Sequence, residues 1–259
     1  MERETVLPTG AVTDVMVSDA AHRYIETAFK LLDFTSMVVA HAGTLDELYN
    51  KIFEIADSRK GRQPRAEVRS AREAFDQHAD LLLEMLMCKG VDNFLLYLSD
   101  FLASVFRRRP EMLKSDEKVS VEFLLEYSDY TDLLDALTER KVLDLSFRGM
   151  VALQDVLRRS MKFEIFPSDV ELAQAVRINE VRNLFIHNRG IISRRFLSRV
   201  PSYAGKVGDS ITPDISLILA DLQFLMRSVL SVDKRGCEKF SIAIPHGLPR
   251  RAESFLSAP

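Results

Sequence analysis

Residues 168–190 read SDVELAQAVRINEVRNLFIHNRG, and this stretch carries the signals of a helix with two defined ends. Ser168, followed three residues later by Glu171, forms a capping box, in which each side chain binds a backbone N–H group that the first helical turn leaves unpaired. Gly190 can adopt the left-handed conformation that closes a helix. The stretch therefore predicts a helix that begins after Ser168 and ends at Gly190.

The apolar side chains of this helix fall on one side of it. A helix turns by about 100° per residue, so residues three or four apart share a face. The side chains expected to face the core are Val181, Leu184, Phe185 and, beyond the helix end, Ile192. Those expected to face outward are Glu180, Asn183 and His187. Arg182 lies at the flank of this polar face, and its long side chain can reach toward whatever the face contacts.

Segments with helical periodicity lie on both sides of this stretch and predict an all-α protein. Gly90 is expected to end one helix and Pro110 the next, because proline disfavours a helical residue before it. A last helix is expected to start at Thr212 and Pro213 and to end near Val232, with a short extended piece at 240–244. The other predicted helices span 19–39, 45–56, 66–88, 91–109, 121–127, 130–141 and 146–161.

These elements suggest three parts of the chain. Gly61 and Pro64 interrupt a polar stretch at 59–65, which predicts a linker. An N-terminal helical extension then occupies 1–65, a helical domain 66–232 and a tail 233–259. The short helices between 121 and 161 are expected to form an insertion between paired long helices.

The composition favours a soluble, cytoplasmic protein. A hydrophobic content of 47% in 259 residues is ample for a buried core. Cys88 and Cys237 have no Cys or His neighbour at metal-ligand spacing, which argues against a disulfide framework or a zinc site. Residues 1–10 mix charges of both signs and do not resemble a signal peptide. The apolar run 94–106 is too short to cross a bilayer and contains Asp100, so no membrane association is expected.

The formal net charge is −3, yet basic residues gather around the 168–190 helix. Between 177 and 199, six arginines accompany one acid, Glu180. Such a zone attracts phosphate backbones whatever their sequence. Alternatively, it is a solvated surface whose cations suit the C-terminal end of a helix dipole. Besides Arg182, the arginines predicted to bind RNA are Arg177, Arg189, Arg194, Arg195 and Arg199.

The spacing Arg182-Asn183-X3-His187 resembles the Arg-Asn-X3-His motif of the HEPN superfamily. The chain also resembles the Tyr-Leu…Phe…Pro-X-X-Leu-X-Ser segment of stand-alone prokaryotic HEPN proteins of the RiboL-PSP-HEPN-like kind. The residues that carry this second similarity are Tyr97, Phe106, Pro110, Leu113 and Ser115. The similarity covers about residues 70–232. Arg189 departs from one subgroup, the toxins paired with nucleotidyltransferase antitoxins, which has Tyr at this place.

The resemblance implies an HEPN-like helical bundle in which the motif helices of two subunits face each other, and hence a homodimer. It further implies a metal-independent endoribonuclease without a cofactor. Arg182 would hold the scissile phosphate of RNA, His187 would take up or donate protons, and Asn183 would orient either group. Glu180 is the candidate for tuning the proton affinity of His187. Stand-alone relatives are commonly placed in conflict systems, which implies a toxin-like or phage-defence effector with an antitoxin or regulatory protein as partner.

Other interpretations stay open. An HEPN-fold module could bind RNA, a nucleotide or a protein partner without cutting, and residues 1–60 could dock a partner as a helical adaptor. An isolated Arg, Asn and His near a helix end often only pair with neighbouring groups. No Gly-rich phosphate loop, Gly-X-Ser-X-Gly elbow or His-Glu-X-X-His helix supports nucleotide hydrolysis, serine hydrolase or zinc protease chemistry. The histidines expected to be structural or at the surface are His22, His41, His78 and His246.

Overall fold

A computed structural model describes residues 15–60, 71–114 and 119–257. Of the described residues 76% are helical, and the sheet found among them has two short strands, so the predicted all-α class is confirmed. The first half contains β1 (Met16–Val17), α1 (Asp19–Lys60), α2 (Ala71–Arg108), the 3-10 helix η1 (Pro110–Leu113), α3 (Val121–Leu125) and α4 (Tyr130–Phe147). The second half contains α5 (Met150–Met161), α6 (Asp169–Asn188), α7 (Arg194–Arg199), α8 (Ile215–Phe240), β2 (His246–Gly247) and α9 (Arg250–Ser257).

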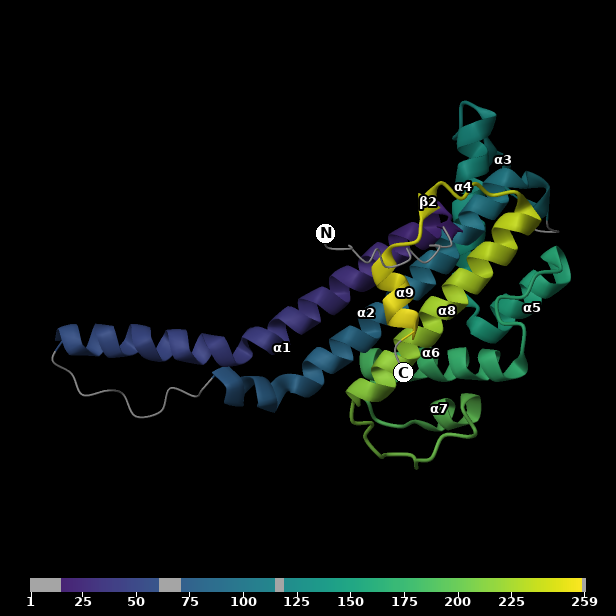
Figure 1. Ribbon diagram of the computed structural model, residues 1–259. Helices are drawn as coiled ribbons and strands as arrows, with labels where there is room; N and C mark the ends of the chain where they lie inside the picture. The colour runs from purple at the N-terminus through teal and green to yellow at the C-terminus, as the bar shows by residue number, and fades with distance from the viewer. Residues whose placement is uncertain (1–14, 61–70, 115–118, 258–259) are drawn as a thin grey trace, which may run out of the picture.

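Helix α2 is the centre of the bundle. It packs against α1, α4, α6 and α8, and α1 and α8 run alongside it (Figure 1). Its buried face is rich in aromatic rings, which contact rings from α8 and from the segment after α5. Large aromatic side chains bury much apolar area, so they favour this face as the core. The fully buried rings of α2 belong to Phe94, Tyr97 and Phe106.

The prediction that Gly90 ends a helix is wrong, because α2 continues through it. A Cβ atom on Gly90 would lie 2.2 Å from Cδ2 of Leu222 on α8. Gly236 on α8 is equally crowded, since its Cβ atom would lie 2.2 Å from Cζ of the buried Phe101. Both glycines therefore let α2 and α8 approach closely, a use of glycine that a local stop signal does not reveal.

Several helix boundaries also differ from the prediction. The helices predicted at 19–39 and 45–56 form the single helix α1, since one glycine at 43 costs only about 1 kcal/mol in a helix. Gly149 adopts a φ of +80° and starts α5 at Met150, four residues later than predicted. Asp214, and not Thr212, caps α8, which runs eight residues beyond 232, to Phe240. Most of the predicted 59–65 linker and the predicted helix start at 66 lie outside the described residues.

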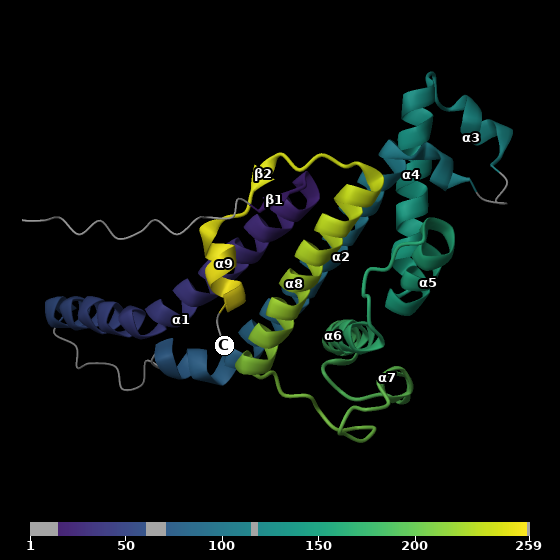
Figure 2. The same ribbon diagram turned by 45° about the vertical axis from the view of Figure 1, so that its right-hand side comes forward.

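The segment predicted as a tail folds back onto the N-terminal part of the chain. Strand β2 pairs antiparallel with β1, so the predicted extended piece at 240–244 lies a few residues further on. Helix α9 packs against α8, and Arg251 forms an ion pair with Asp33 on α1. The predicted tail at 233–259 thus begins inside α8 and ends on the bundle (Figure 2). The three-part division of the chain stays a prediction.

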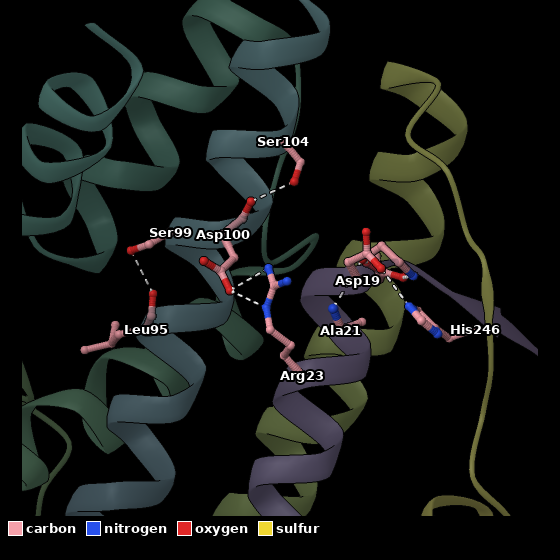
Figure 3. Close-up of polar contacts among 10 residues, drawn as sticks. Asp19, Ala21, Arg23, Leu95, Ser99, Asp100, Ser104 and His246 are labelled. Carbon is pink, nitrogen blue, oxygen red and sulfur yellow. Dashed lines mark hydrogen bonds and ion pairs between the residues drawn. The ribbon is translucent and has the colours of Figure 1, made fainter. Parts of the chain in front are cut away.

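Polar contacts fix the start of α1 at two further points. Nε2 of His246 lies 2.6 Å from Oδ1 of Asp19, and the Arg23 guanidinium binds the carboxylate of Asp100 on α2. Figure 3 shows both contacts. The ring of His22 stacks on that of His246 with centroids 4.1 Å apart. These two histidines therefore take structural positions, as predicted.

Helix α8 is long and apolar enough to cross a membrane by length and composition, and among the described helices it alone passes that test. In this fold it packs against α2 and α9 and buries the carboxyl groups of Asp221 and Asp233. The core helix of a soluble protein has the same length and composition. We therefore interpret α8 as a core helix.

Asp233 connects α8 to the beginning of α1. Its Oδ2 accepts a hydrogen bond of 2.9 Å from the backbone N–H of Ser18, and its Oδ1 accepts one from the Ser18 hydroxyl. Burial raises the pKa of Asp233 above its ordinary value, although both bonds from Ser18 act in the opposite direction. Burial likewise raises the pKa of Asp221, against the effect of Arg177.

Stability is expected to decrease as the pH rises above about 4, where an unfolded aspartate ionises. Because the folded protein keeps its protons on Asp233 and Asp221 to a higher pH, it binds more protons than the unfolded chain across this window, and the free energy of unfolding falls. Asp233→Asn carries no charge and should show a smaller decrease. Urea unfolding over a pH series measures this, with the exposed Asp80→Asn as control; equal slopes in the wild type and Asp233→Asn would contradict it.

Candidate functional site

The predicted capping box at the start of α6 is confirmed. The backbone N–H of Glu171 donates to Oγ of Ser168 over 3.2 Å, and Oε2 of Glu171 accepts from the backbone N–H of Ser168 over 3.0 Å. At the other end both Arg189 and Gly190 are left-handed, so the closing turn begins one residue earlier than predicted. The backbone N–H groups of Arg189 and Gly190 both donate to the carbonyl oxygen of Leu184, that of Gly190 over 3.0 Å. Helix α6 therefore ends at a fixed point next to His187.

The apolar face of α6 is buried as predicted, and its polar face is outward in part. The buried side chains include Val181, Leu184, Phe185 and, after the helix, Ile192. His187 is exposed and Asn183 is half-buried. His187 forms no hydrogen bond or ion pair with any described residue. Its imidazole is therefore available to a ligand.

Glu180 does not face outward, contrary to the prediction. It is only 7% exposed, and its Oε1 accepts a hydrogen bond of 2.6 Å from NH1 of Arg199. The chain turns back after α6 so that α7 lies beside it (Figure 2). This brings Arg199 within hydrogen-bond distance of Glu180. The carboxylate of Glu180 is therefore held by Arg199, and its predicted influence on His187 stays a prediction.

Arg182 is held in place and does not swing freely. Its Nε donates to Oδ1 of Asp92 on α2 over 2.9 Å, and its NH1 donates to Oδ1 of Asn183 over 3.0 Å. The Arg182 side chain is 20% exposed. Asp92 is a site residue that the motif did not indicate. The sole signal for it was an acid near the start of the most apolar predicted helix, 91–109.

Apart from Asp92, these side chains border one cavity of about 700 Å³ between α2, the turn before α5, α6 and α7. The polar part of its lining includes Asn179, Glu180, Arg182, Asn183, His187, Arg195 and Arg199. The apolar part includes Leu95, Leu98, Leu102, Met150, Leu153 and Phe196. We call this space the motif cavity. It combines an apolar wall with several hydrogen-bond donors, as ligand sites commonly do.

The six arginines predicted to surround the motif divide into two groups. Three guanidinium groups are bound by carboxylates, in the pairs Arg177–Asp221, Arg182–Asp92 and Arg199–Glu180. The other three side chains are exposed and have no partner among the described residues; they belong to Arg189, Arg194 and Arg195. Of these three, only Arg195 borders the motif cavity. Arg177 lies outside the cavity lining and is joined to a buried acid.

Comparison with protein-family models, curated proteins and solved structures finds no match to this chain. The relation to HEPN proteins therefore stays a prediction that rests on the motif residues themselves.

The motif cavity brings together groups that could bind and cleave a phosphodiester. His187 can exchange protons, Asn183 and Arg182 can donate hydrogen bonds, and Arg195 supplies a positive charge that no carboxylate offsets. Within the described part of the chain, no group of three or more His, Cys, Asp and Glu side chains could hold a metal ion. Both cysteines, Cys88 and Cys237, are free thiols.

Proposed function

We propose that this protein is a metal-independent endoribonuclease of HEPN type, and that it acts in the cytoplasm as a toxin-like or phage-defence effector. The observation that carries this proposal is the motif cavity, in which Arg182, Asn183 and His187 share one space with Arg195 and Arg199. If the sequence matched the motif only by chance, there would be no reason for these residues to border a cavity or to lie beside two arginines of another helix.

The exposed imidazole of His187 supplies the acid–base group for the reaction. A base takes the proton from a ribose 2′-OH, the 2′ oxygen attacks the adjacent phosphorus, and the bond to the leaving 5′ oxygen breaks as that oxygen receives a proton. The products are a 2′,3′-cyclic phosphate and a 5′-hydroxyl. Arg195 and the free N–H groups of Asn183 stabilise the charge on the phosphate oxygens.

Arg182 takes a more specific role in this proposal than that of a free cation. Asp92 offsets part of its charge and fixes the plane of its guanidinium. Fixed donors stabilise a developing charge without the cost of reordering a flexible side chain during the reaction. Arg182 therefore orients Asn183 and the scissile phosphate, while Arg195, whose charge no carboxylate of the described residues offsets, provides most of the long-range attraction.

Two copies of the chain would supply the second proton-transfer group. One His borders each motif cavity, whereas the reaction requires a base and an acid. Leu96 and Ile186 lie one helical turn from Asp92 and Arg182, and they are 63% and 46% exposed. A second copy docked at the motif would cover this apolar surface, and sedimentation analysis tests for the resulting homodimer.

Replacing Arg195 by Gln is expected to weaken RNA binding by about threefold to tenfold. It should also reduce the slope of log affinity against log salt concentration by about one, which corresponds to one lost phosphate contact. The reason is that Arg195 borders the motif cavity with no carboxylate partner among the described residues. Fluorescence anisotropy with a 2′-O-methyl oligonucleotide measures both quantities without cleavage. Arg159→Gln, at an exposed arginine outside the cavity, is the matched control. If both variants bind alike, Arg195 makes no specific contact.

A second candidate function is an RNA-binding or nucleotide-binding module without cleavage. The pairing of Arg182 with Asp92 favours it, because a guanidinium whose charge is already offset stabilises the negative charge that develops during cleavage less strongly. The test is incubation of the wild type with total RNA and tRNA in excess EDTA, with His187→Ala purified in parallel and all fragment ends sequenced. Cyclic phosphate ends from the wild type alone support the nuclease. Intact RNA that is retained by the wild-type protein would overturn it in favour of the binding module.

A further inference from the structure

A second basic depression lies apart from the motif cavity. It has a volume of about 430 Å³ and lies where the segment after α5 contacts the C-terminal part of α8. The motif cavity uses Met150 and Leu153 near the start of α5, whereas this depression uses the opposite end of that helix. The two spaces share no lining residue. The depression is bordered by Arg158, Lys162, Phe163, Glu164, Arg235 and Lys239.

Arg235 is the fixed centre of this depression. Its NH1 and NH2 donate to the carbonyl oxygens of Glu164 and Ile165 over 2.7 and 2.9 Å, and its guanidinium lies 5.2 Å from the ring centroid of Phe163. Carbonyl oxygens satisfy N–H groups without cancelling a positive charge. Arg235 is half-buried, and this burial lowers its pKa although Glu171 and Glu164 act in the opposite direction. A bound anion would relieve the cost of holding this charge away from water.

The other cations add to this charge. Nζ of Lys239 also binds a carbonyl oxygen, that of Lys162, over 2.8 Å. The Lys162 ammonium has no partner among the described residues. Arg158 is offset, since its Nε lies 2.8 Å from Oε1 of Glu164. Four cations and one acid thus line a single depression.

A purely structural role explains only part of this arrangement. Arg235 and Lys239 satisfy carbonyl groups just beyond the end of α5, where helices leave such groups unpaired. Neither Lys162 nor Arg158 is needed for that task. Glu164 offsets the charge of Arg158, whereas Lys162 adds a charge that no carboxylate of the described residues offsets. The excess of charge therefore points to an anionic ligand.

We propose that this depression binds a phosphate group that carries at least two negative charges, such as the terminal phosphate of a nucleotide or of an RNA end. A backbone phosphodiester carries a single charge and matches the cluster less well. Charge-assisted hydrogen bonds from Lys and Arg are the usual means of binding such groups. The proposal is independent of the chemistry at His187.

Calorimetric titration of the wild-type protein with pyrophosphate at low ionic strength tests the site. One saturable binding event is expected. The double variant Arg158→Gln/Lys162→Asn should bind at least about tenfold more weakly, since it loses two cationic donors and leaves Glu164 unpaired. Asparagine tolerates the left-handed conformation of Lys162, so the fold should be kept. The control Arg159→Gln/Lys234→Gln removes the same charge from exposed positions outside the lining and should change binding by less than about twofold.

Competition identifies the source of the phosphate. Displacement of pyrophosphate by ATP assigns the site to free nucleotides. Displacement by a 5′-phosphorylated 2′-O-methyl oligonucleotide, and not by its 5′-hydroxyl form, assigns it to RNA ends. No saturable binding of pyrophosphate, or equal weakening by the two double variants, would overturn the proposal.

Discussion

The variant His187→Ala is expected to fold normally and to cleave RNA about a thousandfold more slowly than the wild type. The reason for the slower cleavage is that a positioned acid–base group contributes a factor of about 10² to 10⁴ to the rate. In a dimer the substitution removes His187 from both copies, and with it both the base and the acid. The decrease in cleavage rate should therefore lie well inside this range. His187 is exposed and contacts no described side chain through a hydrogen bond or ion pair, so its removal should cost little stability. The measurement is the initial rate of fragment formation from a labelled RNA in EDTA.

His78→Ala is the matched control for this variant. His78 is also an exposed histidine on a long helix, but it lies outside the motif cavity. The control should cleave at the wild-type rate. Both variants should bind a 2′-O-methyl oligonucleotide with nearly wild-type affinity, which separates a loss of chemistry from a loss of binding. Equal cleavage by His187→Ala and the wild type would remove His187 from the mechanism.

Arg177→Met is expected to lower the free energy of unfolding by about 3 kcal/mol at neutral pH, because it leaves a buried carboxylate without its partner. Asp221 is 2% exposed and its ion pair with Arg177 lies between α6 and α8. The loss should shrink as the pH falls toward about 4, since a protonated Asp221 no longer needs a cation. Guanidinium unfolding at several pH values measures this change.

The double variant Arg177→Met/Asp221→Leu is the control, since replacing both members of a buried ion pair by apolar side chains is often nearly neutral. It should recover most of the lost stability and should bind RNA like the wild type. A stable Arg177→Met protein with weakened RNA binding would contradict this result. It would return Arg177 to the RNA-binding group in which its position in the sequence had placed it.

Features that depend on neighbours along the chain could be predicted. The capping box of α6 needs only Ser168 and Glu171, and the apolar face follows from helical periodicity, so both were predicted correctly. Gly90 shows the limit of local rules. Its neighbours in the sequence indicate a helix end, but its contact with Leu222 on α8 decides what the glycine does.

The sequence could predict which residues form the candidate site, but not which of their charges are neutralised by ion pairs. Arg182 and Asp92 are 90 residues apart, and Arg177 and Asp221 are 44 apart. No spacing rule joins such pairs, because their contact depends on how the helices pack. A count of arginines between 177 and 199 therefore overestimated the free positive charge, which the structure leaves on Arg189, Arg194 and Arg195.

The bond between Ser18 and Asp233 spans 215 positions of the chain. During synthesis, α1 emerges from the ribosome long before the segment that holds its first turn. Contacts between such distant positions form late in folding, because the intervening chain must first be ordered. The nascent chain should therefore keep the start of α1 open to proteases and chaperones until the segment around Asp233 has left the ribosome. Limited proteolysis of stalled chains would detect that interval as a cleavage near Val17 that disappears once Asp233 has emerged and can bind Ser18.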